Sequence, residues 1–180
     1  QGGNGLKLAR CQLLACTGVF NISTIGSISA TGSHPSVVIG ADGFPIIAVS
    51  SNSNVLRLIK CNNAACTTSS VNTLTGSVQG QIPTLALGVD GLPIIAYSGP
   101  NSSGIGVVKC INATCTGAPQ LPTFVPDVGF NGTAQRVSLT IGEDGLPVMS
   151  YASGSSLNVL TVAKCTRFDC PFFLTNDIEV

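Results

Sequence analysis

Eight cysteines carry the most reactive side chains in this chain, and they form four pairs with one spacing, Cys-x4-Cys. An even number of cysteines at a short fixed spacing is typical of disulfides formed in an oxidising compartment. The alternative is zinc, which needs converging ligands, but the single histidine, His34, lies far from every pair. We therefore predict no metal, no other cofactor and four disulfides: Cys11–Cys16, Cys61–Cys66, Cys110–Cys115 and Cys165–Cys170.

The motif Gly-x-Asp-Gly-x-Pro occurs three times and places carboxylates at Asp42, Asp90 and Asp144. Calcium is one interpretation, but a calcium loop needs several oxygen ligands at alternating positions. Each loop here has one aspartate, and Glu143 is the only additional carboxylate. We favour a tight turn between two strands, because glycine accepts a positive φ and aspartate tolerates one.

A basic residue precedes the first cysteine of every pair, at Arg10, Lys60, Lys109 and Lys164. These residues could line one rim of the molecule and bind an acidic ligand. We favour solvated charges at a strand edge, where they would discourage unwanted strand pairing.

Two tyrosines are the candidate ligand-binding residues. Tyr97 and Tyr151 end the strand after the Asp-Gly turn in two copies of the repeat, and Val49 takes their place in a third. Aromatic side chains on a rim can stack on sugars, but they pack a core more often, and we favour packing. His34 lies in a turn-rich stretch without a nucleophile motif, so we expect a surface histidine and no catalytic residue.

Four Asn-x-Ser/Thr sequences are candidate glycosylation sites, at Asn21, Asn101, Asn112 and Asn131. The chain starts at Gln1 and contains no signal-like apolar stretch, as expected if a secretory signal has been removed or the chain has been trimmed. Together with the predicted disulfides, these sequences favour an extracellular or cell-surface location.

The reactive groups recur because the chain repeats at intervals of about 50 residues. Alternating or β-branched stretches predict four strands per unit, for example Ser36–Ile39, Ile46–Val49, Val55–Lys60 and Thr67–Val71. The chain opens with only the last two, Leu6–Arg10 and Val19–Ile25. We expect one domain, with a half repeat at 1–30 and repeats at 31–80, 81–120 and 121–180. The last repeat carries an insertion at 121–132.

Four antiparallel strands per repeat are typical of a β-propeller blade. The predicted fold is all-β and β-propeller-like, with about three and a half to four repeats. No stretch shows a helical period. Strand Ile46–Val49 is apolar on both faces and should be central and covered.

The pattern Ile-Gly-x-Asp-Gly-Leu-Pro-x-x-x-Tyr, followed by a strand ending in Lys-Cys-x4-Cys, resembles repeats of secreted bacterial proteins predicted to be β-propellers. It is distantly similar to the Asp-box repeats of sialidases, but tryptophan is absent. A sialidase-like carboxylate clamp would need converging arginines. The four arginines are Arg10, Arg57, Arg136 and Arg167, and the first and last belong to hairpin tips. The resemblance therefore implies a secreted β-propeller protein and gives little support to a sialidase-like hydrolase.

Composition excludes two classes of partner. Charged residues make up 9% of the chain, with eight basic and eight acidic side chains, so no basic face for nucleic acid is expected. No apolar run approaches the roughly 20 residues of a spanning helix, so no membrane insertion is expected.

We rank three functions. The first is a non-enzymatic structural or adhesive module that binds other copies of itself, with Phe172–Leu174 and Leu6–Leu8 as candidate contacts. The second is a glycan-binding lectin, and the third, far behind, is a sialidase-like hydrolase. The unmatched half repeat leaves three arrangements open: a small four-bladed ring with one reduced blade, part of a longer chain, or open ends that meet another copy.

Overall fold

The computed structural model describes residues 5–12, 15–18, 20–25, 34–50, 55–74, 81–99, 104–117, 123–125, 136–153 and 159–178. This part of the chain is all-β and contains no helix, and therefore no helix able to cross a membrane. Its strands are β1 (Leu6–Cys11), β2 (Phe20–Ile25), β3 (Ser36–Ile39), β4 (Pro45–Ser50), β5 (Leu56–Cys61), β6 (Ser69–Thr73), β7 (Gln81–Leu87), β8 (Pro93–Ser98), β9 (Ile105–Lys109), β10 (Thr123–Val125), β11 (Val137–Ile141), β12 (Pro147–Ser153), β13 (Val159–Cys165) and β14 (Phe173–Ile178).

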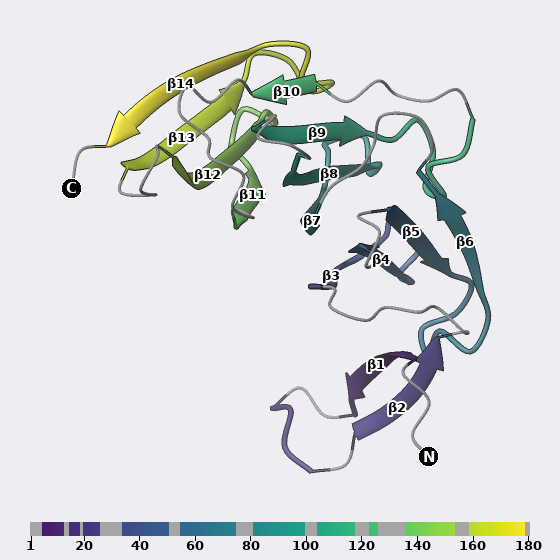
Figure 1. Cartoon of the computed structure of the whole chain (residues 1–180). Coiled ribbons are helices and arrows are strands. Elements are labelled where there is room, and N and C mark those ends of the chain that lie inside the picture. The colour runs from purple at the N-terminus through teal and green to yellow at the C-terminus, as the bar shows by residue number, and fades with distance from the viewer. Residues whose placement is uncertain are drawn as a thin grey trace.

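The strands form four antiparallel sheets, which we number in chain order. Sheet 1 is β1-β2, sheet 2 is β3-β4-β5-β6, sheet 3 is β7-β8-β9-β10 and sheet 4 is β11-β12-β13-β14. Within each sheet, neighbouring strands are also neighbours in sequence. Figure 1 shows the sheets following one another along an open arc, with sheet 1 and sheet 4 at its two ends.

The predicted strand order is confirmed in the described residues. Sheet 1 has only two strands, whereas the other sheets have four, as expected for a half repeat followed by three full repeats. The strand after each Asp-Gly turn is central, and every residue of β4 and β8 is buried. One placement differs from the expectation. The last strand of sheet 3 is β10, which lies inside the stretch that we interpreted as an insertion, past the repeat boundary expected at 120.

Alternation along the strands gives each sheet two apolar faces, because successive side chains point to opposite sides. We call the face turned toward the next sheet in chain order the forward face, and the opposite one the backward face. In sheet 2, Leu56 and Leu58 point forward and pack with Leu85 and Tyr97 of sheet 3. Ile59 of the same strand points backward, into a cluster with Leu6 and Ile25 of sheet 1.

The same packing joins sheets 3 and 4, where Ile105 and Val107 of sheet 3 share a cluster with Met149 and Ala163 of sheet 4. The core is therefore a series of three layers between successive sheets. The Asp-Gly turns also touch along the row. A Cβ built on Gly91 would lie 3.5 Å from Ala41 Cβ, and one on Gly145 would lie 2.6 Å from Val89 Cγ1.

Candidate functional site

The three Asp-Gly motifs form tight turns, as predicted. In the first, the Gly43 N–H donates to Gly40 O and the Gly40 N–H donates to Phe44 O, both at 2.9 Å. Gly43 has a φ of 78°, which explains the glycine at this place. Asp42 Oδ1 accepts the Phe44 N–H at 3.1 Å. One oxygen of the carboxylate therefore stabilises the turn, and the other oxygen can bind a second group.

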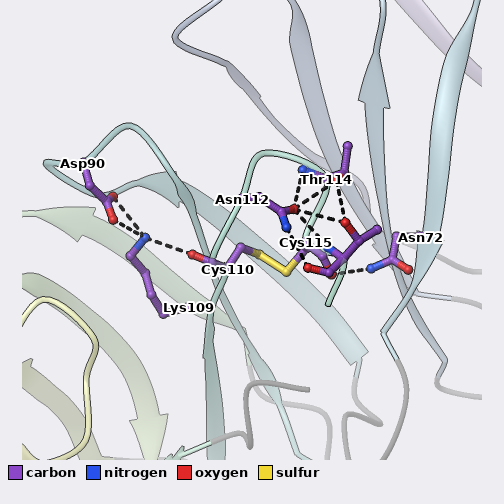
Figure 2. The surroundings of a disulfide bond; sticks show 8 residues. Asn72, Asp90, Lys109, Cys110, Asn112, Thr114 and Cys115 are labelled. Atoms are coloured by element: carbon purple, nitrogen blue, oxygen red, sulfur yellow. Dashed lines mark hydrogen bonds and ion pairs between the residues drawn. A yellow bond between two sulfur atoms is a disulfide. The ribbon is translucent and has the colours of Figure 1, made fainter. Parts of the chain in front are cut away.

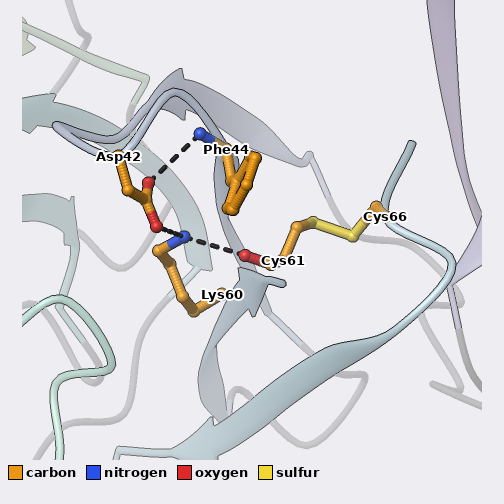
Figure 3. A network of polar contacts seen from close by, with 5 residues as sticks. All are labelled: Asp42, Phe44, Lys60, Cys61 and Cys66. Atoms are coloured by element: carbon orange, nitrogen blue, oxygen red, sulfur yellow. Dashed lines mark hydrogen bonds and ion pairs between the residues drawn. A yellow bond between two sulfur atoms is a disulfide. The ribbon is translucent and has the colours of Figure 1, made fainter. Parts of the chain in front are cut away.

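The second oxygen of each aspartate binds the lysine that precedes the disulfide. Lys60 Nζ lies 2.7 Å from Asp42 Oδ2 and donates to Cys61 O at 2.8 Å, as Figure 3 shows. The contact recurs between Lys109 and Asp90, at 2.8 Å, in sheet 3. In sheet 4, Lys164 Nζ lies 2.5 Å from Asp144 Oδ2.

This arrangement shows that our interpretation of the basic residues as solvated edge charges is wrong for Lys60 and Lys109, whereas Arg10 is exposed as expected. Lys60 and Lys109 are buried, and each ammonium group is enclosed by a carboxylate and a cysteine carbonyl oxygen. Only Lys164 is substantially exposed. The carboxylate and the ammonium group neutralise each other, which is what burial of a charge requires. The sequence signal was the matched spacing of aspartate and lysine, 18 residues in one repeat and 19 in the next.

The ion pairs lower the pKa of the three aspartates. The hydrogen bond from Lys60 holds the pKa of Asp42 below its ordinary value of 3.8, and Lys164 does the same to the pKa of Asp144. For Asp90, burial raises the pKa, but the Lys109 and Leu92 hydrogen bonds together outweigh it, so the pKa is again lowered. All three carboxylates are therefore ionised at neutral pH and occupied by groups of their own repeat.

All four predicted disulfides are present, with Cα–Cα distances of 4.8–5.0 Å. Each closes a hairpin tip, and its second cysteine has a positive φ of 53–58°. In the tip of sheet 3, the Cys115 N–H donates to Asn112 O at 3.1 Å. Figure 2 shows that Asn72 of sheet 2 reaches this tip and donates to Cys115 O. The tip therefore also contacts the preceding repeat.

The glycosylation sites stay predictions. Asn21 is exposed, and its Oδ1 accepts a hydrogen bond from Gln12 Nε2 at 2.9 Å. Asn112 is half-buried, and its Nδ2 donates to Thr116 O at 2.7 Å. Its Oδ1 accepts the Thr114 and Thr116 N–H groups, so this side chain also shapes the tip. Asn101 and Asn131 lie outside the described residues.

The tyrosines lie in the core and not on a rim. Tyr97 is fully buried, and Tyr151 is 3% exposed. The Tyr97 ring covers Gly106, where an added Cβ would lie 2.5 Å from its Cζ, and meets Phe124 edge-on at 6.5 Å. Among the described residues, nothing bonds its hydroxyl group, and burial raises its pKa. This placement fits the packing alternative, because neither ring offers a face to a ligand.

The remaining candidates are not brought together. His34 is exposed, as predicted. Arg57 lies on β5, and Arg167 lies in a hairpin tip, where it pairs with Asp169 at 3.1 Å. In the part of the chain described, no group of three or more His, Cys, Asp or Glu residues could hold a metal ion.

The surface feature that stands out is a cross-strand pair on the forward face of each sheet. The pairs in chain order are Leu6/Ile25, Leu56/Leu74, Ile105/Val125 and Leu160/Ile178. The first three pairs are buried, with every member at most 9% exposed. In sheet 4, Leu160 is 40% and Ile178 is 45% exposed, because no other sheet of the described residues covers this face. At the other end, Phe20 and Ile22 are exposed on the backward face of sheet 1. Leu6 and Leu8, which we expected to contact another copy, instead pack against sheet 2, so that expectation is wrong.

A scan against protein-family models and a search of curated proteins each find no match to this chain. Function is therefore inferred from these surfaces.

Proposed function

We propose that the chain is a non-enzymatic, extracellular structural or adhesive module whose copies associate head to tail. Its four sheets act as blades of a propeller-like array that is left open. The forward face of sheet 4 in one copy packs on the backward face of sheet 1 in the next. The observation that carries this proposal is the Leu160/Ile178 pair, which is exposed only where the series of sheets stops.

The physical basis is the removal of apolar surface from water. Burying a side chain of the size of leucine or isoleucine contributes about 1.5–3 kcal/mol. The two end faces expose Leu160, Leu174 and Ile178 on one side and Phe20 and Ile22 on the other. These side chains must also offset the loss of translational and rotational freedom on association.

The two end faces are different surfaces, so the contact is heterologous. A heterologous contact generates a ring if its rotation closes and a filament if it does not. We propose a filament, in which each copy continues the open row of sheets that the previous copy begins. The four disulfides are compatible with an extracellular location, and we propose that they protect the tips of such an assembly.

Sedimentation velocity over a range of concentrations tests the proposal. The wild-type chain should form oligomers that lengthen with concentration. Ile22→Lys blocks the backward face of sheet 1, and Ile178→Lys blocks the forward face of sheet 4. Each variant alone should be monomeric, because each has lost one partner surface. An equal mixture of the two should form dimers, because the intact sheet 4 of one variant can dock on the intact sheet 1 of the other.

Val71→Lys is the matched control, because Val71 is 48% exposed on β6 of an inner sheet and should not affect assembly. Circular dichroism of each variant establishes that it is folded. A wild-type chain that stays monomeric at every concentration contradicts the proposal and favours a ring closed within one copy. Assembly that survives in both blocked variants contradicts the assigned faces.

A further inference from the structure

We propose that sheet 1 contains an acceptor site for a β-hairpin that carries a Gly-x-Asp-Gly-x-Pro turn. The hairpin would add beside β1, as β3-β4 lies beside β5 in sheet 2, and its aspartate would pair with Arg10. The occupant is a partner of stated chemistry, namely two short apolar strands joined by an acidic Asp-Gly turn. The inference does not depend on self-association.

The first observation is an unpaired sheet edge. In sheets 2, 3 and 4, the strand that leads into the disulfide is paired on both sides. In sheet 1, the equivalent strand β1 pairs with β2 and with no other strand of the described residues. Its other edge presents backbone N–H and C=O groups, which favour the addition of a strand.

The second observation is an apolar surface on the neighbouring sheet. Val37 and Ile39 on β3 are 53% and 59% exposed. Their equivalents on β7 are Leu85, which is 5% exposed, and Leu87, which is half-buried. β7 is covered because β3 and β4 of sheet 2 pack against it, in the cluster that contains Leu85. Sheet 1 supplies no equivalent hairpin to cover β3.

The third observation is a charge without its counterpart. Arg10 occupies the place of Lys60, Lys109 and Lys164, each of which binds the aspartate of its own Asp-Gly turn. The described part of sheet 1 has no such turn, and Arg10 is exposed, with no described residue bonded to its guanidinium group. An incoming aspartate would form a charge-assisted hydrogen bond with its guanidinium group.

The fourth observation is the row of turns. Ala41 lies against Gly91, and Val89 lies against Gly145, so each turn touches the glycine of the next one. A Cβ on Gly43 would meet nothing within 4 Å. Gly91 and Gly145 face the turn of the preceding sheet, so by equivalence the space beside Gly43 faces sheet 1 and matches the missing turn.

The internal repeats also give the register of the added hairpin. Val148 lies opposite Lys164, Ser150 opposite Val162 and Ala152 opposite Leu160. A peptide with the sequence of residues 136–153 should therefore place Val148 opposite Arg10 and Ala152 opposite Leu6. This peptide is a suitable probe because it carries the turn, both strands and an arginine that aids solubility.

The test measures fluorescence anisotropy of the labelled 136–153 peptide with the Ile178→Lys chain as receptor. This receptor has the assembly face of sheet 4 blocked, so failure of hairpin binding and failure of self-association are separate results. We expect saturable binding. Arg10→Gln in the receptor, or Asp144→Asn in the peptide, should each weaken binding by about tenfold, and both together by little more, because they remove one interaction.

Arg10→Lys should restore most of the affinity, since lysine fills this place in the other repeats. Val37→Lys should abolish binding, whereas Val71→Lys should leave it unchanged. Hydrogen exchange should show new protection of the β1 amides when peptide is bound. Absence of binding, binding that is indifferent to Arg10→Gln and Asp144→Asn, or protection confined to β14 would each overturn the proposal.

Discussion

At the scale of single residues, the main feature is a lysine that is buried because an aspartate from the turn of the same repeat reaches it. In each of the three aspartates, Oδ1 accepts a backbone N–H of the turn and Oδ2 binds the lysine. In Asp90, Oδ1 also accepts a hydrogen bond from Lys109. Each ion pair therefore ties the turn between the first two strands to the strand that leads into the disulfide.

Asp90→Asn should lower the free energy of unfolding by about 2 kcal/mol at neutral pH, because Lys109 would stay buried without a counter-charge. The folded-state pKa of Asp90 lies below 3.8, so its stabilisation is present above that pH and is lost as pH falls through the lower value. The difference between wild type and Asp90→Asn should therefore shrink below about pH 4.

Urea unfolding at a series of pH values measures this difference. Glu143→Gln is the control, because this exposed carboxylate lies in the same kind of turn and forms no ion pair with a described residue. An equal loss of stability in both variants would show that the Lys109 ion pair is not the cause.

Tyr97 and Gly106 form a matched pair in the core of sheet 3. Gly106→Ala should lower the free energy of unfolding by about 1–3 kcal/mol, since the added methyl group would overlap the tyrosine ring. Tyr97→Phe should raise it by about 1 kcal/mol, because the buried hydroxyl group has no partner among the described residues. Thermal unfolding measures the stability of both variants. In the double variant Gly106→Ala/Tyr97→Leu, the smaller side chain at position 97 makes room for the methyl group, so part of the stability lost in Gly106→Ala should be recovered. Additive losses would show that the two residues do not share this space.

At the scale of elements, the disulfide tip is a tight turn whose second cysteine adopts the left-handed conformation. This conformation costs a residue with a side chain roughly 1 kcal/mol relative to glycine. The disulfide and the turn hydrogen bond together hold the cysteine there. The tip therefore contains a strained residue in every repeat.

Cys61→Ala/Cys66→Ala should lower the free energy of unfolding by about 2 kcal/mol through loss of the short bridge, while residue 66 keeps the strained positive φ that it has in the wild type. Cys61→Ala/Cys66→Gly removes the same bridge but relieves the positive φ. It should be about 1 kcal/mol more stable than the double alanine variant. Chemical denaturation compares the two. Equal stabilities would mean that the turn relaxes once the bridge is gone.

At the scale of the whole molecule, the chain is a row of sheets in which each layer of core lies between neighbours. Such an array has stability that depends on nearest-neighbour contacts. Within the described residues, sheet 1 has two strands and packs on one neighbour, sheet 2, whereas sheet 3 is packed on both faces. Native-state hydrogen exchange should therefore show β1 and β2 exchanging faster than β8 and β9. Uniform protection along the chain would contradict a row and favour a closed ring.

Much of this architecture was readable from local patterns. The four strands of a repeat, the tight Asp-Gly turns and the disulfides depend on residues close in sequence, so alternation, glycine placement and cysteine spacing predict them. β10 was missed because three residues of strand within a long connection produce little periodicity. Lys60 and Lys109 were wrongly assigned to solvent because a charge before a cysteine gives no information about what surrounds it.

The sequence by itself determined the unit: strands that alternate or are apolar throughout, a glycine turn and a cysteine tip, each specified within about 50 residues. The tertiary structure alone decided how these units use one another. Burial of Lys60 on β5 depends on Asp42 reaching it from the turn between β3 and β4, and exposure of Leu160 and Ile178 depends on the lack of a described sheet beyond sheet 4. The burial of one residue and the exposure of the others both depend on packing between elements. The same local sequence pattern occurs in every repeat, but the neighbouring sheets differ, and the residues of one repeat do not encode which neighbours it has.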